Sequence, residues 1–227
     1  MLLPLFASGQ RMVEYRPDFK FNDGIYISFE DFKNNNPIPV THVISNYDIR
    51  ESDYLEQVLM HDSVNYFDNL YEERKVATHE LWGFCQRNRA FIGFGAEGSF
   101  NNPEFFDFYP LVSIGAISFF TAFESYYRTI GPSPMMGVGY DPMFDSQMTV
   151  TETEQVQLLL AFKTGKILLA KRGELGYIPT ELVFHILQDD PVLLEQFRVL
   201  SGREQKQKGM FYIHEFNARN PIFFPVN

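Results

Sequence analysis

The chain has 227 residues, and its 29 acidic and 19 basic side chains give a formal net charge of −10. A chain of this length forms one large domain or two small ones and can bury a sizeable core. The acidic balance argues against a nucleic-acid partner, since affinity for phosphate backbones comes largely from Lys and Arg. The 24 Phe, 12 Tyr and 1 Trp exclude disorder for most of the chain. The single cysteine, Cys85, excludes an internal disulfide framework and a cysteine-rich metal site.

The first residues are typical of the end of a secretory signal peptide. An apolar run ends at Phe6, and small residues follow at Ala7 and Gly9. Small residues at these two spacings mark a cleavage site, so residues 1–9 are predicted to be a signal-peptide remnant and Gln10 the new N-terminus. The segment departs from the usual pattern, because it has no basic region and its apolar run is short. The alternative is a cytoplasmic protein whose N-terminus packs against the core.

The sequence predicts no transmembrane segment. The longest uncharged stretch runs from Phe108 to Phe123, whereas a membrane-spanning helix needs about 20 apolar residues. We therefore expect an exported form to be soluble or to be attached to the envelope through a partner.

Residues 10–130 form a β-rich region with two short helical interruptions. Aromatic and β-branched runs between turn residues predict its strands. These strands are Gly24–Ile27, Val40–Ile44, Val64–Phe67, Lys75–Cys85, Ala90–Ile92 and a pair formed from Phe108–Phe123, which divides at Gly115. Ser28 and Asp31 predict a capping box for one helical turn. Ser52 or Asp53 is expected to cap the second helix.

The remainder of the chain is predicted to be a loop, a hairpin and helices. Residues 131–149 are rich in Met, Pro and Gly and lack periodicity, which is typical of a long loop. Residues 150–227 follow as a hairpin with its turn at Lys163–Lys166 and then about three helices. The helices are expected to start at Thr180, at Pro191 after the N-cap Asp190, and after the capping box of Ser201 and Glu204. We expect this part to pack on the same domain as the β-rich region.

Enzyme motifs are absent from the sequence, and no two of the five histidines have metal-ligand spacing. His79 with Glu80 is the least improbable acid–base pair, and Asp62 is a third candidate. In a strand, sequence neighbours point to opposite faces, so this adjacency carries little weight. We predict no cofactor and no metal.

Two groups of residues are candidates for contact with a protein partner. Clustered methionines make an adaptable apolar surface, although they also bind Cu(I) or simply pack against a sheet. The cluster in the predicted loop consists of Met135, Met136, Met143 and Met148. The second group is the apolar C-terminal pair Phe223 and Phe224.

Several ordered segments resemble a family of uncharacterised exported proteins of Bacteroidota. They are GIYISFEDFKNNNP at 24–37, LWGFC at 81–85, FYPL at 108–111 and Ile114-Gly115. The resemblance covers roughly residues 12–123 and, more loosely, the stretch Phe216–Pro221. It implies export to the periplasm or outer membrane, and it carries no catalytic residues or established activity.

Together these patterns predict an α+β protein with an antiparallel, aromatic-rich sheet or partly closed barrel, followed by a C-terminal hairpin and about three helices. The function expected from them is that of a non-enzymatic, extracytoplasmic binding or accessory protein. It would act through contacts with a protein partner of the cell envelope. The alternative is a hydrolase that uses His79, Glu80 and Asp62.

Overall fold

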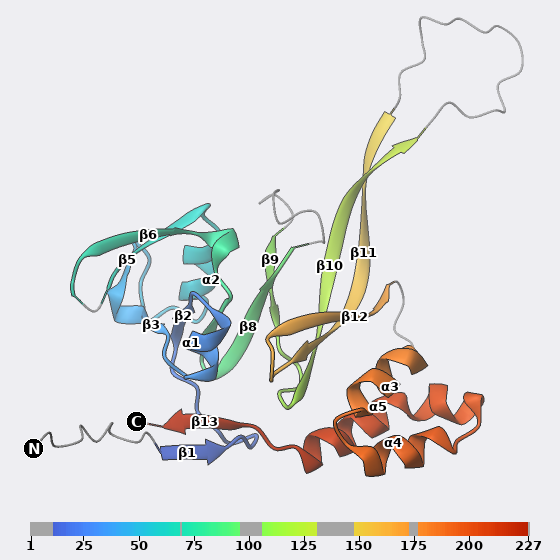
Figure 1. Ribbon diagram of the computed structural model, residues 1–227. Helices are drawn as coiled ribbons and strands as arrows, with labels where there is room; N and C mark the ends of the chain where they lie inside the picture. The colour runs from blue at the N-terminus through green and yellow to red at the C-terminus, as the bar shows by residue number, and fades with distance from the viewer. Residues whose placement is uncertain (1–10, 69, 96–105, 131–147, 173–176, 227) are drawn as a thin grey trace, which may run out of the picture.

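A computed structural model describes residues 11–68, 70–95, 106–130, 148–172 and 177–226. The chain is an α+β protein built on antiparallel sheets, as the sequence predicts. The described strands form four open sheets, and the helices α3 to α5 gather at one end of the molecule (Figure 1). No helix within the described ranges combines the length and the apolar character needed to cross a membrane.

The largest sheet has the strand order β3-β2-β7-β8-β9. Its strands are β2 (Gly24–Tyr26), β3 (Ile38–Pro39), β7 (Gly83–Gln86), β8 (Arg89–Phe94) and β9 (Asp107–Pro110). The short helix α1 (Phe29–Lys33) follows β2 and begins with the predicted capping box of Ser28 and Asp31. Strands β7 and β8 meet in a two-residue turn, where Arg87 and Asn88 adopt φ values of 52° and 63°. Positive φ at both central positions gives the turn type that suits the twist of a hairpin.

A smaller sheet has the order β4-β5-β6 and carries helix α2 (Tyr54–Leu59) beside it. Its strands are β4 (Val43–Ile44), β5 (Ser63–Phe67) and β6 (Glu73–Ala77). Two predicted strands are wrong in part here. Val40–His42 is a 3₁₀ turn rather than the start of a strand, and a second 3₁₀ turn at Thr78–Glu80 divides the predicted strand Lys75–Cys85. The apolar residues on either side of that turn belong to different sheets.

The third sheet has the order β10-β11-β12 and contains the longest strands. They are β10 (Ile117–Ile130), β11 (Met148–Ala161) and β12 (Lys166–Arg172). The β11–β12 hairpin turns where predicted, with Gly165 at φ 71°. The segment Phe108–Phe123 does divide into two strands, but the predicted pairing between its halves is limited to an isolated antiparallel bridge of Ser113 with Phe119. Strand β9 pairs with β8, and β10 pairs with β11.

The three C-terminal helices begin where the sequence predicts. They are α3 (Thr180–Leu187), α4 (Pro191–Arg198) and α5 (Gly202–Arg219). Asp190 caps α4 by accepting hydrogen bonds from the N–H groups of Val192 and Leu193. Ser201 and Glu204 form the capping box of α5. Local capping chemistry therefore determines these starts, as expected for side chains that satisfy the first unpaired N–H groups of a helix.

The chain closes with a two-stranded sheet that the sequence does not predict. Strand β1 (Arg11–Glu14) pairs with β13 (Phe223–Val226), so the two ends of the described chain lie together (Figure 1). The apolar C-terminal residues are therefore part of a sheet rather than a free tail. Pro225 is tolerated because β13 is an edge strand.

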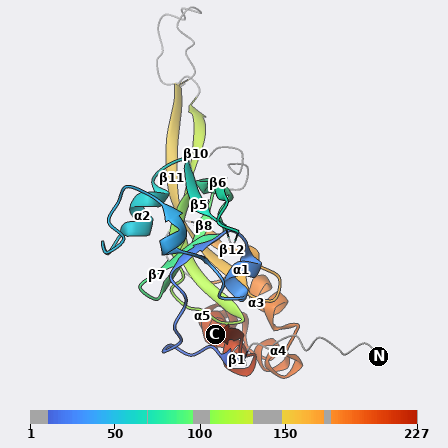
Figure 2. The ribbon, with the colours of Figure 1, turned by 90° about the vertical axis from the view of Figure 1, so that its left-hand side faces the viewer.

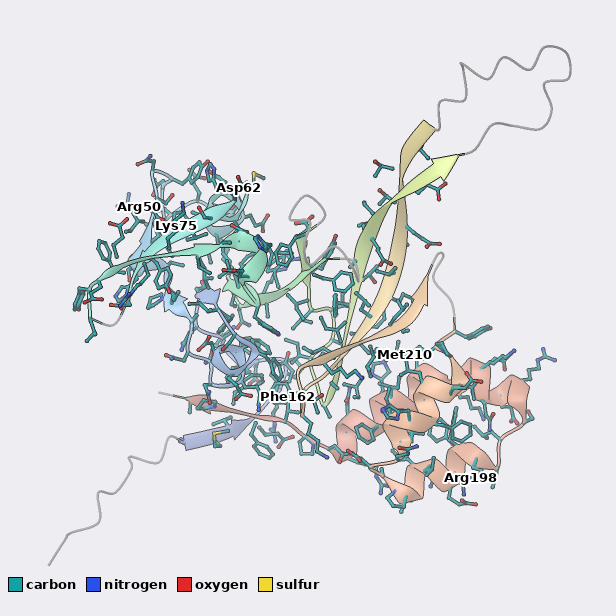
Figure 3. All side chains as sticks on the ribbon, turned by 45° about the horizontal axis from the view of Figure 1, so that its top comes forward. Arg50, Asp62, Lys75, Phe162, Arg198 and Met210 are labelled. Carbon is teal, nitrogen blue, oxygen red and sulfur yellow. The ribbon has the colours of Figure 1, made fainter. Side chains whose placement is uncertain are left out.

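The core unites the N-terminal and C-terminal parts of the chain. Phe32 stacks on Trp82 with ring centroids 4.4 Å apart, and it also lies against Phe162 and Phe224. Figure 3 labels Phe162 where the foot of the third sheet meets β13. On the third sheet, Leu159 packs against the helices, while its neighbour Leu158 faces a cluster with β8 and β9. These clusters bring side chains of residues 150–227 into contact with the β-rich region, and the division into domains stays a prediction.

Candidate functional site

The β10–β11 ribbon extends beyond the rest of the molecule. Strands β10 and β11 pair from Ile117↔Ala161 to Ile130↔Met148, whereas β12 pairs with β11 only as far as Val156↔Arg172. The part from 123 to 130 and from 148 to 155 is therefore a two-stranded ribbon, and no third strand pairs with it among the residues that the structure describes. Figures 1 and 2 show this ribbon projecting from the body in both views. We call it the arm.

The root of the arm is anchored in the core. Phe120 and Ala122 of β10 and Val156 of β11 are fully buried. Tyr109 of β9 donates a hydrogen bond from its Oη to the carbonyl oxygen of Phe123, at 3.1 Å. Burial raises the pKa of Tyr109 above its ordinary value, which keeps the hydroxyl protonated and able to donate. The arm thus starts from a rigid base.

Beyond the root most of the described side chains are polar, and most of them are half-buried or exposed. Ser125 and Thr153 face each other across the strands, with their hydroxyl oxygens 2.8 Å apart. Phe123 is 53% exposed although it is a large aromatic residue. A two-stranded ribbon is marginally stable alone in water, and its edges offer unpaired N–H and C=O groups to another chain. This arrangement suits recognition of a polypeptide by addition of a strand.

A second feature is a cleft between the foot of the third sheet and the helices. Its volume is about 700 Å³, within the range of roughly 300–1,000 Å³ for small-molecule sites. Ile117 and Leu168 of the sheet, Ile186 of α3 and Phe216 of α5 line its apolar side. We call it the helix cleft.

The rim of the helix cleft is polar. Lys163 Nζ lies 3.2 Å from Asp189 Oδ2 across the mouth, and both side chains are largely exposed. Lys166, His185 and Gln188 also line the cleft. Among the described residues, the Lys166 ammonium group forms no ion pair. An exposed pair such as Lys163 with Asp189 contributes only about 0–1 kcal/mol, so it does little to hold the mouth closed.

The predicted acid–base residues gather at one end of the small sheet without meeting. The N–H of Thr78 donates to the carbonyl oxygen of Asp62 at 2.9 Å, which places Asp62 beside the 3₁₀ turn that carries His79 and Glu80. Asp62 and Glu80 are exposed, and His79 is half-buried. Within the described residues, no side-chain hydrogen bond or ion pair joins any two of the three. The hydrolase alternative therefore stays a prediction.

Sequence reasoning missed a nearby pair of titratable side chains. Tyr47 Oη lies 2.9 Å from His61 Nε2, and the two rings stack with centroids 5.9 Å apart. Both residues line a cleft of about 420 Å³ that Lys75 also borders. Figure 3 labels Lys75 and Asp62 on the same small sheet region. No sequence signal points to Tyr47 and His61, because the contact joins the segment before α2 to the segment after it.

Only one of the four methionines predicted to contact a partner lies within the described residues. Met135, Met136 and Met143 lie outside the described residues. Met148 belongs to the first pair of β11 with β10 rather than to the predicted loop of 131–149.

The two C-terminal phenylalanines also differ. Phe223 is 47% exposed and can contact a partner, whereas Phe224 is 0% exposed. Phe224 packs against Phe19, Phe21 and Phe32, so the expectation that it contacts a partner is corrected. The alternation along strand β13 turns these neighbours to opposite faces.

The cysteine is a core residue, as the sequence predicts. Cys85 in β7 is fully buried, with Sγ 3.7 Å from Asp23 Oδ1. Burial, followed by the charge of Asp23, raises the pKa of its thiol well above the usual range. A thiol held protonated in this way is a poor nucleophile. Among the described residues, no three His, Cys, Asp or Glu side chains are grouped so that they could hold a metal ion.

Comparisons of the chain with protein families, with curated proteins and with solved structures find no match.

Proposed function

We propose that this protein is a non-enzymatic binding or accessory protein that acts through contacts with a protein partner in the cell envelope. The observation that carries the proposal is the arm, which extends two paired strands beyond the last residue pair of the third strand. Unpaired strand edges are recognition surfaces for another polypeptide chain. The arm is therefore the part of the described structure that a partner would contact.

The root of the arm and the residues just beyond it favour different roles. The root is buried and tied to β9 through Tyr109, which supports a fixed direction of projection. Just beyond the root, Ser125 and Thr153 are short and polar and meet across the two strands. Among the described residues no third strand pairs with the arm, so main-chain pairing along its edges is the interaction that we expect to dominate.

An extracytoplasmic location is part of the proposal. The signal-like pattern that ends at Gly9 and the resemblance to exported proteins of Bacteroidota support it. Mass spectrometry of the native N-terminus tests the location: a mature chain that begins at Gln10 supports export, and one that begins at Met1 contradicts it.

The binding function is tested by shortening the arm. In the test variant an Asn-Gly turn replaces residues 126–152 and joins Ser125 to Thr153, whose side chains already meet across the strands. A two-residue Asn-Gly turn suits such a pair. Affinity capture from native envelope fractions should recover the same partner with the intact chain and lose it with the shortened one.

A second variant distinguishes binding through the strand edges from binding through the methionines. It keeps the arm and changes Met135, Met136, Met143 and Met148 to Ser. If main-chain pairing dominates, this variant retains the partner that the shortened chain loses. If the methionines provide the contact, both variants lose it. Equal capture by the intact and the shortened chain would overturn the proposal that the arm binds.

A further inference from the structure

We propose that the helix cleft binds a single-chain amphipathic anion, with its apolar tail on the cleft floor and its charged head at Lys166. This site is separate from the arm, and the inference does not depend on the function proposed for the arm. It rests on the division of the cleft into an apolar side and a cationic corner.

The floor of the cleft is formed where the sheet and the helices diverge. Ile117 and Leu168 come from the helix-facing side of the third sheet, and Ile186 and Phe216 come from α3 and α5. These residues belong to the hydrophobic cluster between the two layers, yet they border open space of about 700 Å³. Apolar surface that faces such a cleft gains stability when an apolar chain displaces the water, at about 25 cal/mol per Å².

The charged side chains at the rim favour a ligand with a negatively charged head group. Asp189 carries the one carboxylate among the described residues that line the cleft, and it is already paired with Lys163. Lys166 lines the same cleft and forms no ion pair among the described residues, and His185 and Gln188 add further hydrogen-bonding groups. The cleft thus presents unpaired positive charge on a chain whose net charge is −10. A ligand with one negative head group complements this corner, and a cationic ligand does not.

The test uses dodecanoate, below its critical micelle concentration, in calorimetric titration of the full chain. Two probes separate the contributions of tail and charge. Dodecyltrimethylammonium has the same tail with the opposite charge, and butyrate has the same charge with a short tail. We expect saturable one-to-one binding of dodecanoate, binding of dodecyltrimethylammonium that is weaker by about tenfold or more, and no saturation by butyrate.

Two exposed substitutions locate the site without disturbing the core. Lys166→Gln removes the unpaired charge and should weaken dodecanoate binding by about tenfold. Gln188→Trp places a large ring at the mouth and should abolish saturation. The matched controls are Lys206→Gln and Gln207→Trp, because both residues are exposed on α5 and neither lines the cleft.

The outcomes are decisive in each direction. Selective loss in the two cleft variants, with both controls binding like the original chain, supports the site. The proposal is overturned if dodecanoate shows no saturable binding. It is also overturned if the cationic probe binds equally well, or if the control variants lose affinity as much as the cleft variants.

Discussion

Asn217 of α5 holds the start of strand β10 through both main-chain groups of Ile117. The N–H of Ile117 donates to Asn217 Oδ1, and Asn217 Nδ2 donates to the carbonyl oxygen of Ile117, both at 2.8 Å. The side-chain amide thus acts as one more residue in the ladder at the edge of the sheet. It joins the helical layer to the strand that leads into the arm.

The first prediction concerns this pair of hydrogen bonds between Asn217 and Ile117, which we call the clamp. Asn217→Ala removes both hydrogen bonds and should lower the free energy of unfolding by about 2 kcal/mol, since each bond contributes about 1 kcal/mol. Urea unfolding followed by circular dichroism measures the change. Gln207→Ala, on the exposed side of the same helix, is the control and should change stability by less than about 0.5 kcal/mol. Equal effects of the two substitutions would show that the clamp contributes nothing.

The second prediction concerns the glycine that faces the clamp. A Cβ atom at Gly115 would lie 2.8 Å from Asn217 Cγ, so Gly115→Ala forces the amide to move. The expected loss is about 1–3 kcal/mol. In the double variant Gly115→Ala with Asn217→Ala the clash is gone, so the total loss should be smaller than the sum of the two single losses. Strict additivity in urea unfolding would contradict the proposed contact.

The third prediction concerns the start of helix α2. Gln86 Oε1 accepts from the N–H of Leu55 at 2.9 Å, and Gln86 Nε2 donates to the carbonyl oxygen of Ser52 at 2.6 Å. The side chain of the N-cap residue Asp53 makes no capping hydrogen bond. Gln86→Ala should therefore cost about 2 kcal/mol of unfolding free energy because it strands buried polar groups, whereas Asp53→Ala should be nearly neutral. The reverse order of effects would restore the expectation drawn from the sequence.

The fourth prediction concerns acid stability. Hydrogen bonding from the N–H of Leu193 and the nearby Arg219 guanidinium, whose Nε lies 2.6 Å from Asp190 Oδ2, hold the pKa of Asp190 below its usual value. A lowered folded-state pKa stabilises the fold above the unfolded value of about 3.9, and this stabilisation is lost as the pH falls through the folded-state pKa. Asp190→Asn keeps a capping oxygen but removes the charge.

The matching measurement compares urea unfolding of the original chain and Asp190→Asn at pH 7 and near pH 2.5. The destabilisation caused by the substitution should be present at pH 7 and shrink at the lower pH. With Arg219→Met in both proteins, the pH-dependent part should become smaller while the contribution of the Leu193 N–H persists. A destabilisation that is the same at both pH values would contradict the lowered pKa.

Much of the secondary structure was predictable because its signals are local. The capping boxes at Ser28 and Ser201, the N-cap at Asp190 and the turn at Gly165 all act within four residues, so a sequence reading finds them. The buried state of Cys85 follows in the same way from its apolar strand.

The candidate site was predictable only in outline. The sequence indicates a long connection near residues 131–149, but it does not show that β10 and β11 continue as an arm on either side. The helix cleft and the Tyr47–His61 contact combine residues from separate elements. Sequence periodicity carries no information on which residues of separate elements come into contact.

By itself, the sequence determined the α+β class, the helix starts and the C-terminal hairpin, because these depend on propensity, capping and turn chemistry between near neighbours. Only the tertiary structure decided which strands pair, that Phe224 is buried while Phe223 is exposed, and that Gln86 rather than Asp53 caps α2. These outcomes depend on side chains far apart in the sequence. These side chains compete for places in the core and for the same unpaired main-chain groups. Which of them is buried or hydrogen-bonded is decided only when the whole chain packs.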